Sequence, residues 1–384
     1  MMLVLGLLLF AQVAQADWTP AKRLTWNAGD SRNPAVAVDS TGGLHVVWQD
    51  ETPGKGEVYY KRSTDGGVTW TANKRLTWDL RFASLPTIAV DPSGSLHLFW
   101  HTNDAAYSDI YYKKSTDGGN SWTGNKRLTW TQDNESPEIA VDSSGNLHLV
   151  WYSPLGMHLD TFYRKSTDGG STWTPRKRIT FTFSQPSSFP VIAADPSGNI
   201  HVVWNEDVWT GDWRVYYKKS SDGGATWSAT KQLNWTAGVS MYPRIAIDSL
   251  GNVHVVYYYG PIEYEDTDYE IYYRKSTDAG DTWMPGKRLT WNSVASENPI
   301  IAVDSTNNLH LVWEEGNYWS AELYYKSSTD GGDTWSIGKN LTSTSQHASL
   351  HPRIAADSSG KLHLVWNEGA WSVDAEIYYM KYVK

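Results

Sequence analysis

The octapeptide STDGGVTW occupies residues 63–70, and near-copies of it recur along the chain. They read STDGGNSW from residue 115, STDGGSTW from 166, SSDGGATW from 220, STDAGDTW from 276 and STDGGDTW from 328. A short text repeated at a nearly constant interval predicts a fold built from equivalent units. The octapeptide therefore sets the frame for the rest of the sequence.

The repeated unit extends well beyond the octapeptide. One copy reads NPAVAVDSTGGLHVVWQD followed by EVYYKRSTDGGVTWTANKRLTW. Its start recurs at seven prolines, Pro34, Pro86, Pro137, Pro190, Pro243, Pro299 and Pro352. Each unit of about 50 residues holds four short runs with period-two patterning, and no segment has a helical period. We expect an all-β fold, a seven-bladed β-propeller of four-stranded antiparallel blades.

The two ends of the chain complement each other. The N-terminal DWTPAKRLTW, residues 17–26, aligns with TWTANKRLTW at 69–78, whereas the last unit stops at IYYMKYVK. We therefore expect the N-terminal strand to complete the last blade and close the ring. Residues 1–16 have an apolar core ending in Ala-Gln-Ala, which predicts a signal peptide cleaved before Asp17. Residues 17–384 would then form one exported domain, secreted or periplasmic.

Composition limits the partners. The chain has no cysteine, so packing must supply its stability after export. The formal net charge of −9 argues against nucleic acid, which requires a basic surface. No later stretch is long and apolar enough to span a membrane. Motifs for cofactors or metals are lacking, so we expect neither, and we expect a monomer.

The octapeptide Ser-x-Asp-x-Gly-x-Thr-Trp resembles the Asp box, or bacterial neuraminidase repeat. Six full boxes extend this resemblance to the Asp-box, sialidase-like β-propeller superfamily over the whole mature chain. The superfamily includes sialidases, xyloglucan-cleaving enzymes, sortilin-type receptors and photosystem-assembly propellers, so fold alone does not fix function. The resemblance implies that the box is a fold element remote from the active site. We expect its Asp to bond turn amides, its Gly to permit the bend and its Trp to pack into the blade.

Repetition also accounts for most histidines and tryptophans. One histidine stands in the second run of every unit, where we expect packed hydrogen-bonding residues: His45, His97, His148, His201, His254, His310 and His363. The boxes, the second runs and the outer KRLTW runs use 18 of the 22 tryptophans. The outer runs hold Trp26, Trp78, Trp130, Trp235 and Trp291, which we assign to the scaffold.

The residues that repetition leaves unexplained gather in loops expected on the face opposite the boxes. They include the tryptophans Trp209, Trp213, Trp319 and Trp371, and the histidines His101, His158, His347 and His351. Varied aromatic and acidic loops on a uniform scaffold are typical of a binding face. Carboxylates Glu206, Glu315 and Glu368 follow the second-run tryptophan by two residues, although their recurrence also fits a scaffold role.

The position after the recurrent proline should line the mouth of the central channel. Glu138, Arg244 and Arg353 are its charged occupants, and either ligand contacts or mutual ion pairing would explain them. Our set of candidate ligand-binding residues is Glu138, Glu206, Trp209, Trp213, Tyr242, Arg244, Glu315, Trp319, His351, Arg353, Glu368 and Trp371. Aromatic rings stack on sugars, and arginines bind carboxylates in a bidentate manner. We therefore expect a glycan ligand, with acidic sugars among the candidates.

Two other functions remain open. The resemblance implies a sialidase-type hydrolase, but such enzymes have six blades, an early Arg-Ile-Pro motif, three arginines, a Tyr–Glu nucleophile pair and an acid/base Asp. Here the first unit reads Asn33-Pro34-Ala35, and only Arg244 and Arg353 stand on inner strands. Candidates for the third arginine are Arg32, Arg81 and Arg214, and Tyr residues surround Glu263, Glu265 and Glu270. A protein-interaction or assembly propeller would use the same aromatic face. No catalytic residue is assigned.

Overall fold

The computed structural model describes residues 17–78, 81–103, 107–130, 133–155, 158–181, 186–208, 211–261, 269–344, 347–369 and 375–383. Within these ranges every regular element is a β-strand, and no described segment forms a helix that could cross a membrane. The strands pair into antiparallel four-stranded sheets, and one parallel contact between Trp213 and Val239 joins two of these sheets. The predicted all-β class is confirmed. The proposed signal peptide, Trp209 and Trp371 lie outside the described residues.

Each unit contributes four strands in the order of the chain. The first strands are β3 (Ser31–Val38), β7 (Phe82–Val90), β11 (Glu135–Val141), β15 (Ser187–Ala194), β19 (Val239–Ile247), β23 (Ser296–Val303) and β27 (Ser349–Ala356). The second strands are β4 (Leu44–Asp50), β8 (Leu96–Asn103), β12 (Leu147–Leu155), β16 (Ile200–Asp207), β20 (Val253–Gly260), β24 (Leu309–Glu315) and β28 (Leu362–Glu368). The third strands are β5 (Glu57–Ser63), β9 (Ser108–Ser115), β13 (His158–Ser166), β17 (Trp213–Ser220), β21 (Glu270–Ser276), β25 (Glu322–Ser328) and β29 (Glu376–Val383).

The fourth strands are very short. They are β6 (Lys74–Arg75), β10 (Lys126–Arg127), β14 (Lys177–Arg178), β18 (Lys231–Gln232), β22 (Lys287–Arg288) and β26 (Lys339–Asn340). The N-terminal β1 (Asp17–Trp18) and β2 (Lys22–Arg23) instead pair with β29, at the other end of the chain. The amide of Leu24 also donates to the carbonyl of Ile377 at 2.7 Å. The first and last segments of the described chain thus share one sheet.

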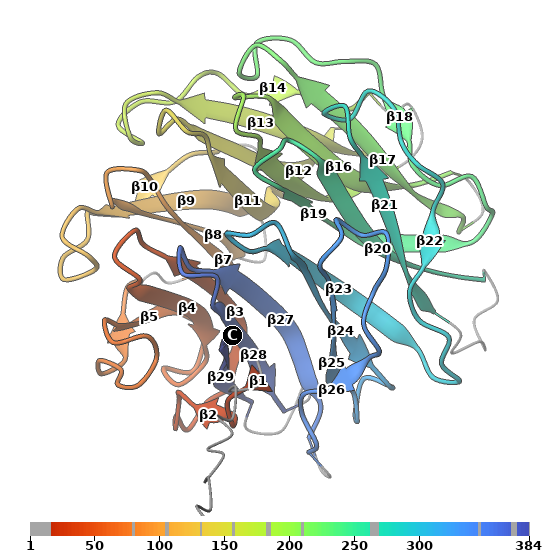
Figure 1. Cartoon of the computed structure of the whole chain (residues 1–384). Coiled ribbons are helices and arrows are strands. Elements are labelled where there is room, and N and C mark those ends of the chain that lie inside the picture. The colour runs from red at the N-terminus through yellow and green to blue at the C-terminus, as the bar shows by residue number, and fades with distance from the viewer. Residues whose placement is uncertain are drawn as a thin grey trace, which may run out of the picture.

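The first strands of successive units lie side by side around a common centre (Figure 1). Contacts run from β3 through β7, β11, β15, β19 and β23 to β27, and β27 also contacts β3. The second strands are buried throughout nearly their whole length, with tryptophans such as Trp48 and Trp151 fully enclosed between sheets. This packing fixes the first strands, whose start forms the site described below.

The Asp boxes are closed by their own side chains. In the first box, both carboxylate oxygens of Asp65 accept hydrogen bonds from the Thr69 amide, at 2.8 and 3.0 Å. The Gly67 amide donates to the Ser63 hydroxyl at 2.8 Å. Equivalent bonds recur in the other boxes. The predicted turn role of the Asp is therefore seen in the structure.

The box tryptophans pack between units rather than within one, contrary to our expectation. Each ring meets the third-strand tyrosine of the preceding unit, as in the edge contact of Trp122 with Tyr60 at 5.3 Å between centroids. The other pairs are Trp18–Tyr325, Trp70–Tyr379, Trp173–Tyr112, Trp227–Tyr163, Trp283–Tyr217 and Trp335–Tyr273. Trp18 thus takes the place of a box tryptophan, as the alignment of the N-terminus predicted. Each box serves as a joint between neighbouring units.

The repeated histidines complete the same joints, and their predicted hydrogen-bonding role is confirmed. In the first unit His45 contacts the Tyr60 hydroxyl through Nδ1 at 2.8 Å and Asp39 through Nε2 at 3.1 Å. The Tyr60 hydroxyl also lies 3.2 Å from the carbonyl of Gly118 in the next box. A Cβ at the following Gly119 would lie 2.0 Å from that hydroxyl oxygen, so this glycine is required by the neighbouring unit.

Candidate ligand-binding cavity

Every first strand has the same irregularity at the recurrent proline. Pairing with the second strand skips two residues, for example between Arg32 and Ala35 of β3. The residue before the proline has a positive φ in all seven units: Asn33, Leu85, Ser136, Phe189, Tyr242, Asn298 and His351, with φ from 45° to 56°. Residues other than glycine rarely adopt this conformation, and a β-bulge of this kind redirects side chains. We call these seven residues the bulge ring.

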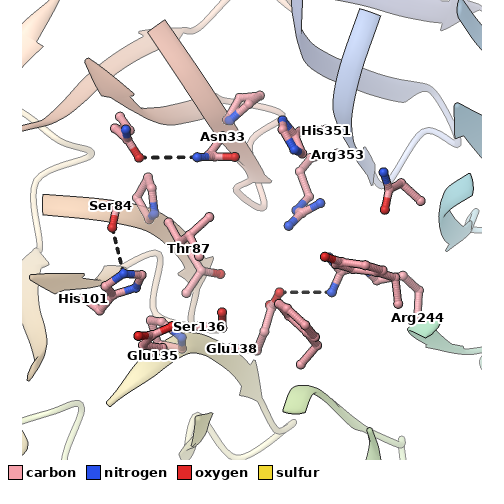
Figure 2. A pocket seen from close by; sticks show the side chains of 18 of the residues that line it. Asn33, Ser84, Thr87, His101, Glu135, Ser136, Glu138, Arg244, His351 and Arg353 are labelled. Atoms are coloured by element: carbon pink, nitrogen blue, oxygen red, sulfur yellow. Dashed lines mark hydrogen bonds and ion pairs between the residues drawn. The ribbon is translucent and has the colours of Figure 1, made fainter. Parts of the chain in front are cut away.

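The bulge ring surrounds a cavity of about 490 Å³ at the centre of the first strands (Figure 2). All seven prolines and all seven bulge-ring residues line it. Four of the residues that follow the prolines line it as well, namely Thr87, Glu138, Arg244 and Arg353. The rest of the lining comes from the first and second strands and includes Gln49, Phe82, Ser84, His101 and Glu135.

One side of the cavity is aromatic. The Phe189 and Tyr242 rings lie 4.7 Å apart and both line the cavity. Tyr152 packs against Phe189 at 5.7 Å, and Tyr258 stacks on Tyr242 at 5.9 Å, so both bulge-ring aromatics are held from behind. Supported aromatic rings of this kind provide an apolar platform with a fixed orientation.

Charged side chains cross the centre. Arg244 Nη1 lies 3.2 Å from Glu138 Oε1, and both side chains are largely buried. Arg353 points towards this pair (Figure 2), but its guanidinium donates only to the carbonyl of Pro352, at 3.2 Å, among the described residues. Burial and the repulsion of Arg244 lower the pKa of Arg353 to about 10. Glu138 and Glu314 act on the pKa in the opposite direction, although neither forms an ion pair with Arg353 among the described residues.

Neutral polar groups flank the charges. His351 Nδ1 lies 3.0 Å from Asn367 Oδ1, and burial lowers the pKa of His351 to about 4, with further lowering by the nearby arginines. His101 contacts the Ser84 hydroxyl at 2.8 Å, and burial lowers its pKa to about 4 as well. Both imidazoles are neutral near pH 7 and can donate or accept one hydrogen bond without adding charge.

A buried carboxylate supports this wall from behind. Glu314 Oε1 accepts the backbone amide of His351 at 2.7 Å, and Oε2 accepts from Asn298 Nδ2 at 2.8 Å. Burial raises the pKa of Glu314 to about 7 despite these donors. Glu314 thus positions two bulge-ring residues without lining the cavity.

The structure brings together five of the candidate residues: Glu138, Tyr242, Arg244, His351 and Arg353 all line the cavity. The remaining described candidates do not line it. Glu206 and Glu315 accept the indole N–H of Trp204 and Trp313, at 3.2 and 3.1 Å, and Glu368 has the corresponding position on β28. Trp213 lies half-buried on β17, and Trp319 is exposed in the β24–β25 connection.

The candidates for a third arginine have other partners. Arg32 is buried on β3 and pairs with Asp30 at 2.5 Å. Arg81 lies 3.5 Å from Asp109, and Arg214 lies 2.5 Å from Asp212. None of these arginines lines the cavity. Glu263 and Glu265 lie outside the described residues, and Glu270 forms an ion pair with Arg288.

Sequence reasoning missed part of the site. Asn33, Phe189 and Asn298 belong to the bulge ring and line the cavity. The residue directly after the second-strand tryptophan holds two of them, because Asn33 donates to Gln49 and Asn298 donates to Glu314. The residue before the proline and the residue after the second-strand aromatic differ from unit to unit, whereas their neighbours repeat. This variation was the signal in the sequence that could have identified them. In the described part of the chain, no cluster of three or more His, Asp or Glu side chains could hold a metal ion.

Comparisons with known proteins agree with the repeat. Residues 125–300 match the model of a "BNR repeat-containing family member". The chain is 25% identical to a sialidase of Clostridium perfringens over 69% of this chain and 64% of the relative. It is 26% identical to a sialidase of Paraclostridium sordellii over 47% of this chain and 50% of that relative. The chain thus spans less than two thirds of either relative.

Among solved structures, an ulvan lyase bound to a GlcA–Rha3S chain superposes with a TM-score of 0.66 and 15% identity, covering 93% of this chain and 95% of that chain. At this level of identity the likeness concerns the fold alone. The six boxes, the repeat-family match and the two sialidase relatives together show that the chain belongs to the BNR/Asp-box, sialidase-like superfamily of β-propellers.

Proposed function

We propose that this protein is an exported glycan-binding propeller and that the central cavity holds the sugar. The observation that carries the proposal is the arrangement of Arg353, a half-buried cation without a carboxylate partner among the described residues, in the cavity that the Phe189–Tyr242 platform also lines. A pyranose ring has an apolar C–H face that an aromatic platform covers and hydroxyl groups that neutral polar side chains bind.

We propose further that the preferred sugar carries a carboxylate. An anion next to Arg353 would supply the carboxylate partner that this side chain lacks among the described residues, and a guanidinium binds a carboxylate through two parallel hydrogen bonds. Glu138 already neutralises Arg244, which leaves Arg353 as the primary anchor. Neutral His351 and Asn33, which line the same cavity, would bind sugar hydroxyls.

The proposal includes the whole-chain architecture. We propose seven blades, with β1 and β2 completing the last one, because residues 17–26 pair with β29 and β27 contacts β3. A ring of this kind would hold the seven bulge-ring residues at fixed positions around one ligand. Export by the N-terminal segment would place the cavity among extracellular or periplasmic glycans.

A sialidase-type hydrolase is the second candidate. The two relatives named sialidase favour it, and Tyr242, Glu138, Arg244 and Arg353 lie around one cavity. Against it, Glu138 is paired with Arg244, and no third described arginine lines the cavity. Binding of a protein partner at the same face is the third candidate function.

The test incubates the purified protein with a defined panel of neutral, uronate-containing and sialylated glycans, and measures the masses of bound and free pools. We expect unchanged acidic glycans in the bound pool, and their loss in Arg353→Gln but not in Arg214→Gln, an arginine paired away from the cavity. A product mass shift would instead support hydrolysis and identify the cleaved bond. An empty bound pool with no cleavage would refute both sugar functions and favour a protein partner.

A further inference from the structure

The tryptophans of the outer strands are not part of the packed scaffold, contrary to our expectation. Trp26, Trp78, Trp130, Trp235 and Trp291 are 64–72% exposed, and Phe181 at the same position is 63% exposed. By contrast, the leucine or isoleucine two residues earlier is buried in each of these six segments. These exposed aromatic residues follow the short fourth strands, which lie at the periphery of the sheets (Figure 1), and none of them lines the central cavity.

Four of the five tryptophans, and Phe181 as well, have an arginine three residues earlier that is held in one fixed arrangement. In the first, Arg23 Nε donates to the Thr25 carbonyl at 2.7 Å, and Nη2 pairs with the buried Glu376. Arg75 and Arg288 repeat both contacts beside the Trp78 and Trp291 rings. Arg127 repeats them three residues before Trp130, and Arg178 repeats them beside Phe181. In the four arginines that accompany a tryptophan, the Nη1 nitrogen donates to no described residue: Arg23, Arg75, Arg127 and Arg288.

Each ring also lies at a junction between two units. Lys61 of the following unit donates to the Leu24 carbonyl and lies with its Nζ 5.7 Å from the Trp26 ring centroid. Lys113 and Lys326 take the same position at Trp78 and Trp291, and Arg164 takes it at Trp130. Lys61 and Lys113 are buried, so the exposed polar group beside these two rings is the arginine, already neutralised by its carboxylate.

We propose that these four sites, each an exposed indole with an adjacent oriented guanidinium, bind uncharged pyranose units of a polysaccharide, independently of the cavity. We call them rim sites: Trp26 with Arg23, Trp78 with Arg75, Trp130 with Arg127, and Trp291 with Arg288. The indole covers the apolar face of a sugar ring, and the unused Nη1 hydrogens bind a hydroxyl. The carboxylate neutralises the arginine, so its free N–H groups can donate to an uncharged hydroxyl without a charged partner on the ligand.

Repetition of the rim sites suits a repeating ligand. Single exposed tryptophans are common on protein surfaces, but four with the same oriented donor are a pattern. Weak sites on one molecule that engage one polymer chain, or neighbouring chains of a matrix, reinforce one another through effective concentration. The rim sites would then hold the protein on a polysaccharide while the cavity binds a separate sugar.

A structural explanation competes with this proposal. The aromatic ring could serve only to shield the Lys or Arg that joins two units. At the junction of the sixth and seventh units both are replaced together, the aromatic residue by Ser343 and the cation by Met380. That explanation predicts a loss of stability on removing the indoles and no change in polysaccharide binding. The proposal predicts the reverse, so both quantities must be measured on the same variants.

The first experiment is native electrophoresis of the full chain in gels containing soluble xyloglucan, mannan or dextran. We expect at least one polymer to retard the protein, and the quadruple variant W26A/W78A/W130A/W291A to lose at least five-fold in retention with an unchanged melting temperature. Trp319→Ala, an equally exposed tryptophan outside the rim sites, should retain full retention. Arg353→Gln should also leave it unchanged, which separates this result from the cavity proposal.

Three outcomes would overturn the rim sites: no retardation by any of the three polymers, full retardation of the quadruple variant, or an equal loss in Trp319→Ala. A gain-of-site variant provides the complementary measurement. Asn340→Arg with Ser343→Trp would build a rim site on β26, where Glu322 already occupies the carboxylate position. Retention by the same polymer should increase about two-fold, and no increase would contradict the proposed geometry.

Discussion

Arg244 Nη1 lies 3.2 Å from Glu138 Oε1, in a contact that links two non-adjacent units across the cavity. The pair leaves Arg353 as the cavity cation without a carboxylate partner in the described structure. Of the two roles that the sequence left open for these residues, mutual pairing therefore applies to Arg244, while Arg353 remains available to a ligand. This asymmetry leads to the first prediction.

Arg353→Gln should weaken binding of an acidic glycan by about 10- to 100-fold, because a hydrogen bond to a charged group contributes roughly 1.5–3 kcal/mol. Glu138→Gln should strengthen it, since Arg244 then becomes a second anchor. Titration calorimetry with the best acidic glycan of the panel measures both. Equal losses in the two variants would show that Glu138, too, contacts the ligand.

Gly119→Ala should destabilise the fold far more than Gly94→Ala. Both glycines have a φ near +85°, at +87° and +82°, but a Cβ at Gly119 would meet the Tyr60 hydroxyl of the preceding unit whereas Gly94 has open space. We expect a loss of about 1 kcal/mol at Gly94 from backbone strain, and several kcal/mol at Gly119. Urea denaturation compares them, and similar losses would contradict the role of the inter-unit joint.

The fold should lose stability as pH falls below about 6.5. Burial lowers the pKa of His45, His97, His148 and His363, so the unfolded chain binds protons that the folded chain does not. Their contribution is present above the unfolded pKa of about 6.5 and is lost as pH falls through the folded values. Urea midpoints at pH 7.5, 6.5, 5.5 and 4.5 test this. Midpoints that rise on acidification would refute it.

Glu314→Gln should isolate a pH dependence of the opposite sign. Because burial raises the pKa of Glu314 to about 7, its protonated form stabilises the fold below its ordinary value, and this contribution is lost as pH rises to about 7. Stability of the parent relative to the variant should therefore fall by up to roughly 3 kcal/mol between pH 4.5 and 7.5. The titratable groups near Glu314 are Glu297, Arg353 and His351, and His351 is neutral above its lowered pKa of about 4. A pH-independent difference would contradict the buried ionisation.

Deleting residues 17–26 should lower the melting temperature sharply, by 10 °C or more. The deletion removes β1 and β2 from β29, takes the Trp18 ring from Tyr325 and exposes buried Ile377 and Tyr379. Exposure of two such side chains costs about 3–6 kcal/mol. Differential scanning calorimetry of the two proteins measures the shift. An unchanged melting temperature would refute the proposed completion of the last blade.

The bulge ring explains why the site was only half predictable. Residues after the proline, such as Arg353, were recognised because strand periodicity places them on the inner edge. Of the residues before the proline, Tyr242 and His351 were among the predicted candidates, whereas Asn33, Phe189 and Asn298 were missed because nothing in the sequence marks the bulge at which they stand. All seven have a positive φ, and no local pattern in one unit signals that conformation.

The sequence by itself determined the all-β class, the repeat, the turn role of each box Asp and the hydrogen-bonding role of the repeated histidines. These features depend on local geometry or on periodicity, which one chain displays many times. Only the tertiary structure decided which side chains meet between units, as the box tryptophans meet tyrosines of the preceding unit and Arg244 meets Glu138. It also decided that the outer tryptophans are exposed to solvent. The contacts of Trp122 with Tyr60 and of Arg244 with Glu138 join residues about one and two repeat lengths apart. They depend on the angle between sheets, which local sequence does not encode.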